Sequence, residues 1–171
     1  MPSTADRGDV PPPIKALPRR LEPVAELVPT GRSVADVGTG DGKLAAWLAA
    51  AGHRVIATEN KPGPRLEALR LLEPLGIECR LGEGLQPILP GEVEVAVIAG
   101  MGGRTIGRIL AASPDVVASL RALVLQPVQH GDELLAGLLA QGYRVSGGAE
   151  IEQRSHRYSA FLVLPPYSTA R

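Results

Sequence analysis

The feature of this sequence that most constrains its fold is a regular alternation of two kinds of segment after residue 32. Short apolar runs rich in Val, Ala, Ile and Leu predict strands at 33–38, 54–59, 77–84, 93–100, 122–127, 143–152 and 157–165. Segments with helical spacing predict helices at 43–51, 63–75, 104–113 and 131–142. Strands that alternate with helices predict an α/β fold, in which a mostly parallel sheet is covered by helices on both faces.

The end of the chain departs from this alternation. The runs 143–152 and 157–165 follow one another with no helix between them. They predict a hairpin, so the last strand of the seven-stranded sheet is expected to run antiparallel to the others. This layout resembles the Rossmann-like class I methyltransferases that use S-adenosylmethionine (SAM). Plain dinucleotide-binding domains generally lack the hairpin.

The 171 residues suit one domain. Residues 1–13 are polar and end in three prolines, which predicts a disordered tail. Apolar residues at helical spacing over 14–28, interrupted by Pro18 and Pro23, predict short helices before the main fold. We therefore expect a single domain over 14–171.

Composition limits the compartment and the kinds of partner that we expect for the protein. The formal net charge is +0, so any basic surface must be local. Cys79 is the single cysteine, which favours a reducing compartment and a buried core position. No apolar run is long enough for a bilayer, and the N-terminus lacks the apolar core of a secretory signal. These features favour the cytoplasm, and no spacing of Cys, His and acidic residues indicates a metal.

A glycine cluster follows the first predicted strand and opens a helix. The segment 35–42 reads ADVGTGDG, a G-x-G-x-G pattern that lets a ligand approach the backbone. Glu59 ends the second strand, where an acid can accept from both ribose hydroxyls of a nucleoside, and Glu83 follows the third, near an adenine edge. The predicted cofactor-binding residues are Asp36, Gly38, Thr39, Gly40, Gly42, Glu59, Asn60, Gly82, Glu83, Gly84 and Ala99. SAM is the favoured ligand; a nicotinamide or flavin cofactor, or an ordinary strand-to-helix turn, are the alternatives.

The fourth predicted strand ends in a second glycine cluster. The segment 98–103 reads IAGMGG, at the point where a SAM methyltransferase presents its methyl group to the acceptor. Many base-modifying relatives place an acidic residue or Asn and a Pro-Pro-aromatic turn there. The predicted catalytic residues are Gly100, Met101, Gly102 and, at the end of the fifth strand, Gln126.

Four motifs carry a more specific resemblance. The segments IAGMGG and LVLQP, preceded by RLGEGL and by the pattern RL–VAELVP–G–SVADVGTG, resemble the bacterial tRNA adenine-N1-methyltransferase family named TrmK, and the similarity runs from about Leu17 to Pro165. The resemblance implies methylation of N1 of the adenine at position 22 of tRNA. N1 has a free lone pair at neutral pH, so the enzyme has mainly to flip and orient the base. Met101 would form an apolar wall and Gln126 would bond a base edge; core packing and a satisfied strand-end amide are the alternatives.

The sequence departs from this family in three places. Its first motif reads DVGTGDGKLAAWL, where the family has Asp-His-Ala-Tyr-Leu after Gly-Thr. Val128 follows the LQP motif, where the family has Asn. Members carry a C-terminal helical domain that grips tRNA, and this sequence stops at Arg171, so we expect the catalytic domain alone.

Three groups of arginines are expected to border the carboxyl edge of the sheet and bind RNA phosphates. The predicted RNA-binding residues are Arg19, Arg20, Arg104, Arg108, Arg154 and Arg157, with His156 beside the last two. The alternative is that they are ordinary solvated surface. Two other functions stay open on this fold: a small-molecule SAM methyltransferase, and a SAM-binding protein without catalysis.

Overall fold

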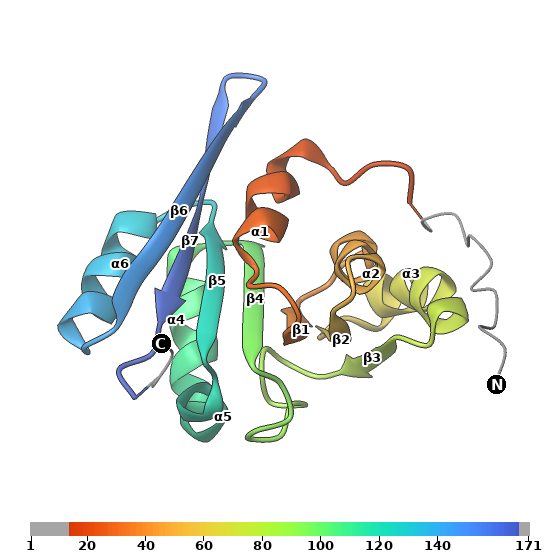
Figure 1. The fold of residues 1–171 in the computed structure, drawn as a ribbon, viewed down its shortest axis with the longest axis horizontal. Coiled ribbons are helices and arrows are strands. Elements are labelled where there is room, and N and C mark those ends of the chain that lie inside the picture. The colour runs from red at the N-terminus through yellow and green to blue at the C-terminus, as the bar shows by residue number, and fades with distance from the viewer. Residues whose placement is uncertain (1–13, 168–171) are drawn as a thin grey trace, which may run out of the picture.

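The computed structural model describes residues 14–167, which form one seven-stranded sheet between two layers of helices (Figure 1). The predicted tail over 1–13 lies outside the described residues, as do residues 168–171. The strands are β1 (Ser33–Val37), β2 (Arg54–Glu59), β3 (Glu78–Leu81), β4 (Val95–Met101), β5 (Ala122–Pro127), β6 (Arg144–Gln153) and β7 (His156–Leu164). Their order across the sheet is β3-β2-β1-β4-β5-β7-β6.

The pairing confirms the predicted mixture of directions. Strands β1 to β5 pair in parallel, whereas β7 pairs antiparallel with both β5 and β6. Strand order reverses at β1 and β4, and in open α/β sheets ligands bind at the carboxyl ends of strands beside such a reversal.

The two helical layers bury two separate apolar cores. One layer contains the 3-10 turn η1 (Arg19–Leu21) and helices α1 (Glu22–Leu27), α2 (Lys43–Ala50) and α3 (Pro62–Leu72), which is followed by η2 (Glu73–Leu75). The other contains α4 (Gly103–Ala112), α5 (Pro114–Ser119) and α6 (Gly131–Ala140). Alternate residues of β1 show the division, because Val34 packs with the first layer and Ala35 with the second.

Helix α5 is not among the helices predicted from the sequence. Its six residues are too few for a clear period, although Pro114 at the first turn and Asp115 beside it are typical of a helix start. Val116 and Val117 are buried in the second core, and this packing holds the short helix in place.

The β6–β7 hairpin extends beyond the carboxyl edge of the sheet (Figure 1). Pairing with β5 begins at Phe161, so residues 156–160 of β7 pair with β6 alone. The hairpin turn, with Arg154 and Ser155 at positive φ, therefore projects on the side where β1 to β5 end.

Cys79 lies on β3 with 3% of its surface exposed, which confirms the predicted core position. Burial raises the pKa of its thiol. Among the described residues, no helix is both long and apolar enough to cross a membrane. Within residues 14–167 no group of three or more His, Cys, Asp or Glu side chains is placed to hold a metal ion.

Candidate cofactor and acceptor site

The first glycine cluster forms the loop between β1 and α2. Gly38 and Gly40 have φ values of +68° and +61°, a region that strains residues with a Cβ, so glycine is needed for this turn. Beneath the loop, Thr39 Oγ1 donates a hydrogen bond of 2.6 Å to Asp36 Oδ2. Asp36 is 3% exposed, and burial raises the pKa of its carboxyl to about 6. Asp36 and Thr39 thus support the loop from within the fold.

Glu59, at the end of β2, holds the first two loops together. Its Oε2 accepts a hydrogen bond of 3.0 Å from the backbone N–H of Gly40. Its Oε1 accepts from the backbone N–H groups of Asn60 and Lys61 at 3.0 and 3.1 Å. A carboxylate has about four lone-pair positions, so one remains for a ligand. In this conformation Glu59 can hold one ribose hydroxyl, whereas the sequence predicted bonds to both.

A cleft of about 290 Å³ opens where β1, β2 and β3 end. Of the predicted cofactor-binding residues, the cleft is lined by Gly38, Gly40, Glu59, Asn60, Gly82, Glu83 and Gly84. Asp36, Thr39, Gly42 and Ala99 are not among its lining residues. Lining residues that the sequence analysis missed are Lys61, Pro64, Thr105 and Ile109. Lys61 could have been inferred from its place beside Asn60, whereas the two α4 residues reach the cleft only through tertiary packing.

A β-bulge shapes the turn at the end of β4, residues 100–102, which we call the acceptor turn because the methyl acceptor is expected there. Ala99 lies opposite Gln126 and Met101 opposite Pro127, so Gly100 is an extra residue in the ladder, with φ of +75°. In a regular strand Met101 would face the same side as Val97 and Ala99, which pack with the first core. The bulge reverses this alternation, so Met101 packs with the second core. Met101 also lines the cofactor cleft.

Met101 connects the acceptor turn with the glycine loop. Its Cε lies so close to Gly38 that a Cβ on Gly38 would collide with it. Met101 is also half-buried against the second core, so its position fits both the predicted apolar wall and the alternative of core packing.

The segment after β5 fastens the acceptor turn from the other side. Val128 donates a backbone hydrogen bond of 2.9 Å to the carbonyl of Met101, and Gly103 donates one of 2.7 Å to the carbonyl of Gln129. A Cβ placed on Gly103 would collide with the backbone of His130, whereas a Cβ placed on Gly102 would meet nothing within 4 Å. The turn is held firmly at both ends and is open at Gly102.

Gln126 lies at the end of β5, as predicted, but its amide contacts the interior of the protein. It is 0% exposed, and its Nε2 donates a hydrogen bond of 2.6 Å to the backbone carbonyl of Arg20. Its Oε1 is buried and has no hydrogen-bond partner among the described residues. The amide therefore does not present itself to an acceptor in this conformation, and it ties η1 to the end of β5.

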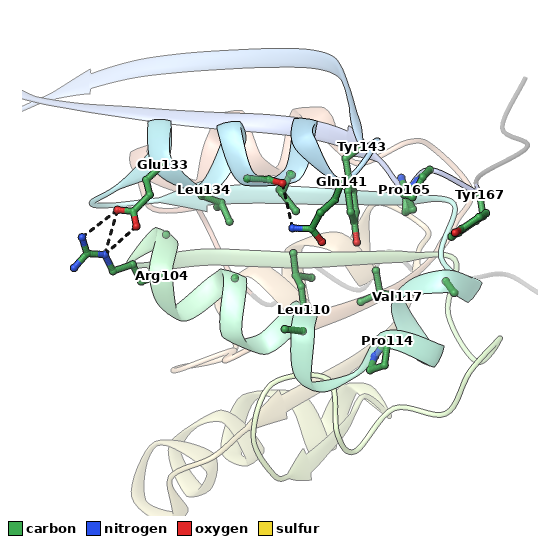
Figure 2. A pocket seen from close by; sticks show the side chains of 17 residues that line it. Arg104, Leu110, Pro114, Val117, Glu133, Leu134, Gln141, Tyr143, Pro165 and Tyr167 are labelled. Carbon is green, nitrogen blue, oxygen red and sulfur yellow. Dashed lines mark hydrogen bonds and ion pairs between the residues drawn. The ribbon is translucent and has the colours of Figure 1, made fainter.

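The six predicted RNA-binding arginines fall into distinct environments. Arg20 lies beside Gly100, whereas Arg19 is exposed. Arg104 pairs with Glu133 of α6 at 3.1 Å (Figure 2), and Arg108 donates to Thr105 at 3.3 Å. Arg154 and Arg157 lie at the turn of the projecting hairpin. The charge of Arg104 is thus partly compensated within the protein.

A second, larger groove of about 600 Å³ lies between α4 and α6 (Figure 2). It is lined mainly by apolar and small side chains, with the Arg104–Glu133 pair at one end and Tyr143, Pro165 and Tyr167 at the other. None of its lining residues lines the cofactor cleft. It is a separate feature of the opposite face of α4.

The Rossmann-like sheet, the terminal hairpin and the cleft over glycine loops are typical of the SAM-dependent methyltransferases. A family model described as "Methyltransferase domain" matches residues 17–161. The tRNA (adenine(22)-N(1))-methyltransferase of Bacillus subtilis is 34% identical over 153 residues, which is 85% of this chain and 64% of that protein. The chain belongs to the methyltransferase-domain family and, within it, to the TrmK family.

Solved structures agree with this assignment. The crystal structure of the B. subtilis M1A22 tRNA methyltransferase TrmK matches with a TM-score of 0.80 and 33% identity, over 88% of this chain and 67% of that one. Streptococcus pneumoniae Sp1610, solved in complex with S-adenosyl-L-methionine, matches with a TM-score of 0.83 and 31% identity, over 91% of this chain and 76% of that one. The chain spans 64% of the length of the curated relative that it matches.

Proposed function

We propose that this chain binds SAM in the cleft over β1, β2 and β3 and transfers the methyl group to N1 of an adenine in tRNA. The relative from B. subtilis is named for the adenine at position 22, which is the position we propose here. The observation that carries the proposal is the chemistry of the acceptor turn. Met101 lines the cofactor cleft, and neither it nor its neighbours Gly100 and Gly102 bear an ionisable side chain. An acceptor at this turn must bring its own nucleophile, and N1 of adenine has the required lone pair.

The cleft fits SAM on its own residues. The buried Glu59 carboxylate keeps one lone-pair position that can accept a hydrogen bond, which suits a ribose hydroxyl. Glu83, exposed in the loop after β3 and lining the cleft, would accept from the exocyclic amine of the adenine moiety. SAM supplies an electrophilic methyl group bound to a sulfonium sulfur. The contribution of this chain is to orient the acceptor over Gly100 and Gly102 and to exclude water with Met101.

The rim of the site suits RNA better than a small acceptor. Gly100 is exposed, and the hairpin that carries Arg154 and Arg157 extends past the sheet edge where β4 ends. A small-molecule enzyme would be expected to enclose its acceptor. We propose that Arg19, Arg20, Arg154 and Arg157, with Arg104 and Arg108, contact tRNA phosphates, and that the protein works in the cytoplasm, where tRNA is modified.

The decisive experiment is methyl transfer from labelled SAM to bulk tRNA, followed by nucleoside analysis. We expect the label in 1-methyladenosine. The matched control is a tRNA transcript in which guanosine replaces adenosine 22, which should accept no methyl group. Label in another nucleoside, or equal methylation of the control, would refute the proposed target. No transfer to RNA of any kind, with SAM bound, would favour a SAM-binding protein without catalysis.

A further inference from the structure

The turn η1 brings one arginine to the acceptor turn. Nη1 of Arg20 lies 3.3 Å from the point where a Cβ of Gly100 would stand. The Arg20 side chain is half-buried, yet within residues 14–167 its guanidinium has no hydrogen bond or ion pair. A guanidinium carries five N–H donors and a permanent charge. Its nitrogens are not among the buried atoms without a partner, so they reach the surface at the edge of the acceptor turn and are free to bind an anionic ligand.

The other half-buried arginines show how unusual this is. The described chain has three besides Arg20, and each of them has an acceptor. Arg32 and Arg80 pair with glutamates at 2.9 and 2.6 Å, and Arg65 donates to a backbone carbonyl at 3.0 Å. Arg20 alone among these four has no acceptor for its side chain among the described residues, and it lies at the edge of the acceptor turn.

Gln126 holds Arg20 in this place. Its Nε2 donates to the carbonyl of Arg20 across a sequence separation of 106 residues. Gln126 lies at the last regular pair of the β4–β5 ladder, opposite Ala99 and directly before the bulge at Gly100. The Gln126 amide therefore holds η1 beside the end of β4, where Gly100 begins the acceptor turn. Burying this amide with Oε1 unpaired has a cost, which an apolar side chain would avoid.

We propose that Arg20 binds the backbone phosphate of the nucleotide that is flipped onto the acceptor turn, and that Gln126 is a positioning residue that acts through the main chain of Arg20. The proposal rests on the function proposed above. A guanidinium fork matches two phosphate oxygens, and a flipped nucleotide brings its own phosphate to the mouth of the site. Binding of this phosphate orients the base above Gly100 and gives Arg20 its missing acceptor.

The first test measures tRNA affinity over a range of salt concentrations. Arg20→Ala should weaken binding about tenfold and reduce the slope of log affinity against log salt by about one, because one phosphate contact is lost. SAM affinity should not change. Lys15→Ala is the matched control, since it removes one positive charge from an exposed residue of the same segment. It should leave binding within about twofold. Equal effects of the two variants would overturn the proposal.

The second test uses Gln126→Met, which keeps the volume of the side chain and removes its amide. We expect it to reproduce the loss of tRNA affinity and of kcat/KM seen for Arg20→Ala, with SAM affinity retained. The double variant should bind no more weakly than Arg20→Ala alone, because both changes remove one contact. Additive losses would show that Gln126 does not act through Arg20.

The outcomes separate this inference from the proposed function. If the wild-type protein methylates tRNA and Arg20→Ala binds it equally well, the inference is wrong and the function stands. If the wild-type protein neither binds nor methylates tRNA, the proposed function fails, and this inference fails with it.

Discussion

The carboxylate of Glu59 accepts a hydrogen bond of 3.0 Å from the backbone N–H of Gly40, so the end of β2 fixes the conformation of the loop after β1. The third loop joins the same unit, because the backbone N–H of Gly82 donates to the Glu59 carbonyl at 3.0 Å. One residue thus connects all three loops of the cofactor cleft.

Glu59→Gln should weaken SAM binding by about 1–3 kcal/mol, the usual cost of unpairing buried polar groups. The new amide nitrogen replaces one oxygen and faces an N–H donor, either of Gly40 or of Asn60 and Lys61. Isothermal titration calorimetry measures the change. Glu67→Gln, on the exposed face of α3, is the control and should bind SAM as the wild type does. An unchanged affinity for Glu59→Gln would remove Glu59 from the cofactor site.

Met101→Ala should lower kcat/KM for tRNA roughly tenfold, because the acceptor loses the wall that spans from the turn to Gly38. Met101→Leu keeps most of the apolar volume and should retain most of the activity. Steady-state kinetics with both variants compare the two effects, and thermal unfolding checks that the fold is intact. If Leu and Ala at this position are equally active, Met101 is only core packing.

Gly102→Val should abolish methyl transfer and leave the fold and SAM binding intact. The φ of Gly102 is −66°, which any residue adopts, and a Cβ there meets no protein atom within 4 Å. The added side chain would therefore fill only the space that an acceptor needs. Gly137→Ala, on α6 and equally unobstructed, is the control and should keep full activity. Wild-type turnover by Gly102→Val would show that the acceptor enters elsewhere.

The buried Asp36 should make stability depend on pH. Its pKa is about 6 in the folded protein against an ordinary value of 3.8, so between these values the folded state binds more protons than the unfolded chain. The free energy of unfolding should therefore fall as the pH rises through this window, by about 3 kcal/mol at most. Asp36→Asn lacks this titration, so its stability relative to the wild type should increase over the same window and level off above it.

Urea denaturation of both proteins from pH 4 to pH 8 measures this difference, at roughly half-unit steps about the predicted window. The comparison removes the effect of Glu92, whose pKa is lowered to about 2 by Arg80 and which both proteins share. A difference that is constant with pH would show that Asp36 titrates in the fold as it does in the unfolded chain.

Much of the fold could be predicted because its signals are local. The strand over 54–59 was predicted at its observed bounds, and the terminal hairpin was recognised from two strands with no helix between them. Helix α5 was missed because six residues show no clear period, and packing of Val116 and Val117 decides its conformation. Glu59, Asn60, Gly82 and Glu83 were placed in the cleft because parallel strands end at one edge.

The sequence by itself determined the α/β architecture, the carboxyl-edge location of the cleft and the resemblance to the TrmK family, because hydrophobic period, glycine turns and short motifs are properties of neighbouring residues. Only the tertiary structure decided what the functional side chains touch. The bulge at Gly100 places Met101 against Gly38, Gln126 reaches the carbonyl of Arg20 and not the acceptor, and Arg104 pairs with Glu133. These contacts join residues from distant parts of the chain. They depend on the register of the strands and the packing of the helices, which no local pattern encodes.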